Sequence, residues 1–352
     1  MIYQIPISQP PITSYQHITC ILALTDHYNK TTNKNSYMNW FMLQYLNIML
    51  YRWNEHPSNL RFDNCFNAHT HISCGILSCD VYNGAEMVQH SVDFSEFASG
   101  KIKEGFAIYV RLNRHCIVEP INFEPYNYNQ QGYDSSWSHE TLISGYDSEK
   151  QEFYLSDFYD NKFRTISIDG HILNLSFSTA RRIHTDNYRR QDVIACRTFS
   201  DNQLNITYDP LALLFLIERW LRGGTMGDRF LGITCFDVID ERIQKCGLLT
   251  FDVRVLSVLY DHTTAVLLIL NYLIETGKII GDQYLINHTE DARKTALICL
   301  NLLLKYKIEA KENDQHNNKM RTLLNSLKDK EEMIFKRLHA LVLSSMESAR
   351  NI

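Results

Sequence analysis

Residues 136–158 read SWSHETLISGYDSEKQEFYLSDF, and this stretch decides the fold that we predict for the first part of the chain. An alternating apolar run follows His139, the polar residues SEKQ interrupt it, and a second short run, EFYLS, leads to Asp157. Two such runs around a polar turn predict a β-hairpin. Because the first strand of an antiparallel pair starts beside the end of the second, we expect His139 and Asp157 to meet if they point to the same face.

An imidazole held by a carboxylate is the base and orienting half of a nucleophilic triad, and Cys20 is the candidate nucleophile. Residues 19–29 have helical spacing, which puts Cys20 in the first turn of a predicted helix. Unpaired amides at a helix start favour a thiolate and lower a cysteine pKa from about 8.5. Gln16, one turn upstream, is the candidate oxyanion donor. The alternative that Cys20 is simply a small apolar residue packed in a core helix remains open.

Composition excludes several classes of protein. The chain has 352 residues, 45% of them hydrophobic, and a net charge of -5 with scattered basic residues, so we expect no nucleic-acid partner. Its longest apolar runs stop short of the roughly 20 residues that span a bilayer, so we expect no membrane partner. The first residues lack a secretion pattern, which favours the cytoplasm and reduced thiols for the nine cysteines.

The chain changes character near residue 200. Before it, the runs at 105–120, 161–169 and 191–199 predict further strands. After it, Asp209 and Pro210 form a helix start and helical periodicity dominates. We therefore predict an α+β domain over residues 1–200, followed by an all-helical bundle over 201–352 that acts as a lid or docks a partner.

Three finer predictions concern single segments. Ser36 is expected to cap a helix that runs to residue 53, residues 222–228 are expected to form a flexible break, and residues 251–277 are expected to form two adjacent helices.

Residues 65–79 hold five cysteine and histidine side chains of the kind that bind zinc. Their spacing matches no zinc finger, and apolar residues alternate between them as in a strand. We predict no metal there, with zinc as the open alternative; the side chains are Cys65, His69, His71, Cys74 and Cys79.

The order Cys20, His139, Asp157 resembles that of the papain-like cysteine hydrolases. Within that group the chain is most similar to the N-terminal domain of the butirosin biosynthesis protein H family and to related chains found with peptide synthetases. The stretches that carry the resemblance are HITCILALTDHY (17–28), FAIYVRLNRHCI (106–117), SHETLISGYD (138–147), FYLSDF (153–158) and FDVRVLSVLYDH (251–262). Bacteriocin-processing peptidases are similar through the histidine and aspartate alone. The resemblance implies a papain-like fold for residues 1–200.

The resemblance also implies thioester chemistry. Cys20 would attack an acyl thioester on the phosphopantetheine arm of an acyl or peptidyl carrier protein, and a small-molecule amine would resolve the acyl enzyme in natural-product biosynthesis. His139 would move the protons, Asp157 would fix the ring tautomer, and Gln16 with the Cys20 amide would hold the oxyanion. No resident cofactor is implied, and a homodimer is left open.

The loop at 121–137, just before His139, is rich in Tyr and Asn and could form the wall that binds the acceptor. Plain packing of its aromatic residues is the alternative; they are Tyr126, Tyr128, Tyr133 and Trp137.

Three rival functions remain open. Water in place of the amine would make the same site a thioesterase or amide hydrolase. A peptidase would need an open cleft for an extended chain. A papain-like module retained for binding or scaffolding would have an unreactive, deeply buried Cys20.

Overall fold

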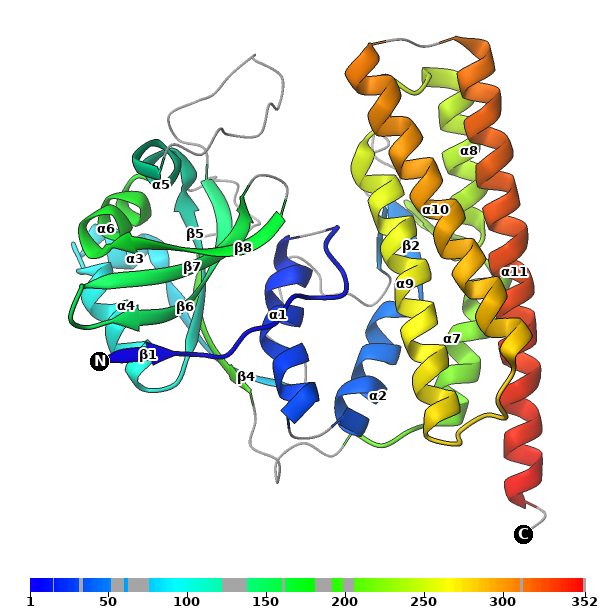
Figure 1. Ribbon diagram of the computed structural model, residues 1–352, viewed down its shortest axis with the longest axis horizontal. Coiled ribbons are helices and arrows are strands. Elements are labelled where there is room, and N and C mark those ends of the chain that lie inside the picture. Colours follow the sequence, from blue (N-terminus) through cyan, green and yellow to red (C-terminus); the bar gives the residue numbers. More distant parts are fainter. Residues whose placement is uncertain are drawn as a thin grey trace. The chain divides into compact units, whose positions relative to one another are not determined.

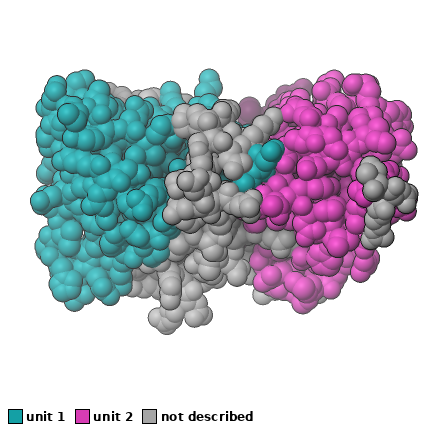
Figure 2. All heavy atoms as spheres, turned by 90° about the horizontal axis from the view of Figure 1, so that it is seen from below, with its two compact units in different colours: residues 1–37, 66–205 teal, residues 38–65, 206–352 magenta. Residues whose placement is uncertain are grey.

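The computed structural model describes residues 1–14, 16–31, 34–51, 60–62, 76–121, 138–159, 162–180, 192–198, 206–310 and 313–350. The chain divides into two compact units: residues 1–37 with 66–205, and residues 38–65 with 206–352 (Figure 2). The α+β class is confirmed, and helices dominate the C-terminal part. Residues 38–65 belong to the second unit, so each unit combines separate stretches of chain, unlike the single boundary near residue 200 that we predicted.

The first unit is built on an antiparallel sheet (Figure 1). Its strand order is β4-β9-β5-β6-β7-β8, and β1 pairs with the last residues of β6. The predicted hairpin is present as β6 and β7, which register Leu142 opposite Ser156. The strands are β1 (Ile2–Gln4), β4 (Leu77–Asn83), β5 (Ala107–Asn113), β6 (Ser138–Asp147), β7 (Glu152–Tyr159), β8 (Lys162–Asp169) and β9 (Asp192–Thr198).

Helices pack on both faces of this sheet. On one face, α4 (Phe94–Lys103) and α6 (Gly170–Ser178) share a core with Ile108, Val110 and Leu112 of β5. Two aromatic rings join these helices, because Phe94 stacks on Phe177 with ring centroids 3.9 Å apart. On the other face, α1 (Gln16–Thr31) contacts β6, β7 and β9 (Figure 1). The remaining described helices of this unit are α3 (Gly84–Gln89) and α5 (Arg114–Ile121).

Two helix predictions in the first part of the chain are wrong. Helix α1 begins at Gln16, so Cys20 lies in its second turn and not in its first. Helix α2 spans Lys34–Tyr45, so Ser36 lies inside it, and the residues that follow form the strand β2 (Ile48–Tyr51). Strand β2 forms because it pairs with β3 (Leu60–Phe62) and β11 (Arg229–Leu231), and helical periodicity does not reveal such partners.

Within the described residues, the second unit contains most of α2, five further helices and a small sheet. The sheet has the order β10-β11-β2-β3, with β10 at Gly224–Met226, so the predicted break at 222–228 is in fact part of a hairpin and the region is not all-helical. The predicted helix pair at 251–277 is one helix, α9. The helices are α7 (Pro210–Arg222), α8 (Thr234–Cys246), α9 (Val253–Glu275), α10 (Gln283–Glu309) and α11 (Asp314–Arg350).

Helix α9 is long and apolar enough to cross a membrane by length and composition alone. Its most apolar window has a mean hydropathy of 1.5, and 61% of that window is buried inside the protein.

The start of α7 agrees with its prediction, because the Asp209 side chain accepts hydrogen bonds from the amides of Leu211 and Ala212.

Candidate active site

His139 and Asp157 meet on the hairpin as predicted. The Nδ1 atom of His139 lies 3.2 Å from Oδ2 of Asp157, and the hydroxyl of Thr141 donates to the same oxygen over 3.2 Å. The register of β6 and β7 explains this arrangement. Leu142 pairs with Ser156, so Thr141 and Asp157 each lie one residue beyond that pair, and His139 is two residues from Thr141 on the same face. Asp157 is 1% exposed, whereas the side chain of His139 is 26% exposed. The pair therefore joins a buried carboxylate to an imidazole that solvent reaches.

Arg114 completes this group, although the predicted site residues did not include it. Its Nη1 lies 3.4 Å from Oδ2 of Asp157, and its Nη2 donates to the carbonyl of Phe158. Its guanidinium carbon lies 4.9 Å from the ring centroid of Tyr159. A buried carboxylate is costly unless it is paired and hydrogen-bonded, and Arg114 supplies the positive charge. The signal in the sequence was a basic residue at the end of the strand that pairs with the histidine strand.

The charges around His139 set its protonation. Burial lowers the pKa of His139, but the charge of Asp157 and the hydrogen bond to it outweigh burial, so the pKa is raised above its ordinary value. The Glu140 charge raises the pKa of His139 further, while Arg114 lowers it. The carboxylate thus favours an imidazolium with a proton on Nδ1, as a base that must hold a proton between two steps requires.

Cys20 is deeply buried. Its side chain is 1% exposed, and no disulfide includes it. The first four amides of a helix lack an intrahelical acceptor, and the Cys20 amide is the fifth in α1. An amide at this position ordinarily donates to the carbonyl four residues earlier, which disfavours its expected use as an oxyanion donor. Gln16 lies at the start of α1, and its side chain is outside the described residues.

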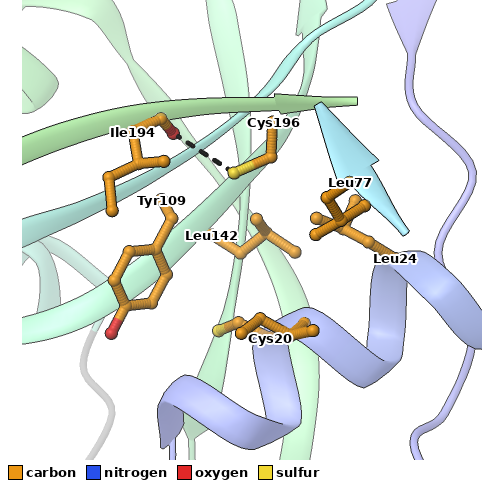
Figure 3. A pocket seen from close by; sticks show the side chains of 8 residues that line it. Cys20, Leu24, Leu77, Tyr109, Leu142, Ile194 and Cys196 are labelled. Atoms are coloured by element: carbon orange, nitrogen blue, oxygen red, sulfur yellow. Dashed lines mark hydrogen bonds between the residues drawn. The ribbon is translucent and has the colours of Figure 1, made fainter. Parts of the chain in front are cut away.

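A small cavity adjoins Cys20 (Figure 3). It has a volume of about 10 Å³, which is close to the minimum for one water molecule. Its walls include Tyr109 of β5, Leu142 of β6 and Cys196 of β9. Burial raises the pKa of Tyr109 well above its ordinary value, and the charges of Glu140 and Cys20 add to this effect. The cavity as it stands has no room for an acyl chain.

The cavity and the His139 pair belong to different faces of the sheet. Side chains alternate along a strand, so Leu142 points away from the face that holds His139 and Thr141. The two regions come closer at the end of β7, because Cys20 lies within electrostatic range of Tyr159 and contributes to the raised pKa of that residue after burial and Asp157. The structure therefore joins His139 to Asp157 and places Cys20 in the same unit, under the opposite face.

Several predicted residues fall outside the described part of the chain. The proposed acceptor wall, namely Tyr126, Tyr128, Tyr133 and Trp137, lies there, as do four of the five metal-type side chains at 65–79. The fifth, Cys79, lies in β4. Among the residues that the structure describes, no group of three or more His, Cys, Asp or Glu side chains could hold a metal ion.

No family model matches the chain, and no curated protein matches it.

Proposed function

We propose that the protein is a cysteine-dependent acyltransferase with a papain-like first unit, in which Cys20, His139 and Asp157 act as nucleophile, base and orienting carboxylate. The observation that carries the proposal is the 3.2 Å contact between His139 and a buried Asp157 that Arg114 and Thr141 also hold. Such a partner set keeps the histidine in one tautomer while it moves protons, as a catalytic base requires.

The reaction would proceed in two acyl transfers. His139 takes the proton of the Cys20 thiol, and the thiolate attacks the thioester carbonyl of a carrier-bound acyl group. The carbonyl–sulfur bond to the phosphopantetheine arm breaks, and the departing thiolate takes the proton from His139. An amine then attacks the acyl enzyme while His139 accepts its proton, and the amide product leaves as Cys20 recovers a proton. Gln16 would stabilise the oxyanion in each tetrahedral intermediate.

This mechanism requires Cys20 to become accessible. The sulfur would have to leave its one-water cavity and reach Nε2 of His139 near the start of β6.

Acyl-enzyme formation tests the proposal directly. The full chain is incubated with acyl-pantetheine thioesters and carrier-bound thioesters, and its intact mass is measured before and after an amine is added. We expect an acyl adduct that an amine discharges and that Cys20→Ser and His139→Ala abolish. Cys246→Ser is the matched control, because Cys246 is an exposed cysteine in the other unit. An adduct that persists in Cys20→Ser would refute the assignment, and discharge by water alone would make the protein a hydrolase.

A second candidate is a papain-like module that binds a partner without turnover. The burial of Cys20 and the small volume of its cavity favour this reading. It predicts that iodoacetamide labels Cys246 long before Cys20 in the native protein, and that no thioester acylates the chain. Acylation of Cys20 at any thioester concentration would eliminate this candidate.

A further inference from the structure

Cys79 and Cys196 form a pair of thiols on neighbouring strands. The antiparallel ladder of β4 and β9 places the two residues directly opposite each other, and their Sγ atoms lie 3.4 Å apart, within hydrogen-bond distance. The Cα atoms of directly opposed residues are about 4.5–5.5 Å apart. Disulfides span about 4.4–6.8 Å between their Cα atoms. The backbone is therefore already placed for a bond between the two sulfurs.

The two thiols differ in solvent access, and the pKa of Cys79 is lowered. Cys79 is partly exposed, and β4 ends the strand order of the described sheet, whereas Cys196 is 6% exposed. The hydrogen bond with Cys196 lowers the pKa of Cys79 and outweighs burial and the charge of Asp80, which raise it. An accessible thiol with a lowered pKa is well placed to attack a disulfide, so we expect Cys79 to react first.

We infer that Cys79 and Cys196 form a reversible cross-strand disulfide when the protein meets a small disulfide such as oxidised glutathione. The Cys79 thiolate attacks one sulfur of the oxidant, a mixed disulfide forms, and one glutathione thiolate leaves and takes up a proton. Cys196 then loses its proton to solvent and attacks the Cys79 sulfur, which forms the protein disulfide and releases the second glutathione. Two protein thiols are oxidised, and the disulfide of the oxidant is reduced.

The bond would change the surroundings of Cys20. The two sulfurs would approach from 3.4 Å to about 2.05 Å, and Cys196 is a wall of the cavity at Cys20. Closure would also tie the outer strand β4 to β9 across a sequence separation of 117 residues. The inference rests on the geometry of the two strands and does not depend on the proposed acyl transfer.

Peptide mapping of the wild-type protein tests the inference. The chain is incubated with excess oxidised glutathione, its remaining thiols are alkylated without reduction, and the digest is analysed by mass spectrometry. We expect a linked peptide pair joining Cys79 to Cys196, with a mass lower by two hydrogen atoms, which a thiol reductant separates.

Three variants sharpen the test. Cys79→Ser should lose the linked pair, and Cys196→Ser should accumulate a stable mixed disulfide on Cys79, because no second thiol can displace glutathione. Cys246→Ser, the matched control, should keep the linked pair. The inference fails if wild-type Cys79 and Cys196 remain alkylatable while exposed Cys246 carries glutathione, or if either is joined to a different cysteine such as Cys20.

Discussion

Arg114 and His139 contact the same oxygen of Asp157. The guanidinium lies 3.4 Å from Oδ2 and the imidazole Nδ1 lies 3.2 Å from it, so two cationic groups compete for one buried negative charge. The carboxylate raises the pKa of His139, and the guanidinium lowers it. The position of Arg114 therefore limits how strongly Asp157 can hold the imidazolium form.

Replacing Arg114 should change both the pKa of His139 and the unfolding free energy of the protein, and the two changes can be measured separately. In Arg114→Gln the pKa of His139 should rise, because the opposing positive charge is lost. The protein should also lose roughly 3–5 kcal/mol of unfolding free energy, the usual effect of leaving one member of a buried ion pair alone. NMR titration of the histidine ring protons and urea denaturation measure the two effects. Arg254→Gln, which removes an exposed pair with Asp252, should change neither by a comparable amount. An unchanged His139 titration would contradict the shared contact.

Removing the carboxylate charge of Asp157 should change the pKa of His139 in the opposite direction. In Asp157→Asn the pKa of His139 should fall, because burial then acts without the compensating charge. If the proposed function holds, acyl transfer should drop by roughly 10²–10⁴-fold, the usual contribution of a positioned base. The rate of amine discharge and the NMR titration of His139 check the two outcomes. A lowered pKa with full activity would remove Asp157 from the mechanism and leave the electrostatics intact.

His262 should give the second unit a pH-dependent stability. It is fully buried, with Nδ1 3.2 Å from a carboxylate oxygen of Glu331 and Nε2 3.0 Å from the carbonyl of Leu46. Both neighbours are acceptors, so the ring satisfies them as an imidazolium, stacked near Trp220 and Phe335. Burial lowers the pKa of His262, but Glu331 and the carbonyl outweigh it and the pKa is raised.

The sign of the effect follows from the raised pKa. The folded state binds the proton more tightly than the unfolded state, so this stabilisation is complete below about pH 6.5, the unfolded value, and is lost as the pH rises through the folded value. Urea denaturation across this interval should show falling unfolding free energy in the wild type, and this fall should be absent in His262→Gln. Equal slopes in the two proteins would show that His262 does not carry the proton.

Gly145 should tolerate no side chain. A Cβ atom at this position would lie 2.6 Å from Cδ2 of Tyr154 and 3.1 Å from the carbonyl oxygen of Tyr3, where β1, β6 and β7 meet. Gly145→Ala should cost about 1–3 kcal/mol of unfolding free energy, the range for overpacking. Gly100→Ala is the matched control, because nothing lies within 4 Å of its Cβ and it sits inside α4. That change should stabilise by about 0.4–1 kcal/mol. Thermal denaturation of both variants measures these changes, and equal stability of the two variants would contradict the close contact at Gly145.

The hairpin and its His139–Asp157 contact could be predicted from the sequence because both depend on local features. Alternation with a period of two and a polar turn between the runs specify an antiparallel pair, and the antiparallel pair brings its two ends together. Helix α7 could be predicted for the same reason, since Asp209 and Pro210 act within one turn of chain. No such local rule predicts that Arg114 approaches Asp157. The two residues are 43 positions apart, and only the pairing of β5 with β6 and of β6 with β7 brings them together.

Local features of the chain were enough to predict the α+β class, the hairpin, the meeting of His139 with Asp157 and the start of α7, because periodicity and capping act between neighbours in the chain. Long-range packing alone sets the end of α2 at Tyr45 with a strand after it, the position of Cys20 under the sheet face opposite His139, and the contact of Cys79 with Cys196. These features depend on which distant strands pair and in which register, and burial of the whole sheet selects that pairing.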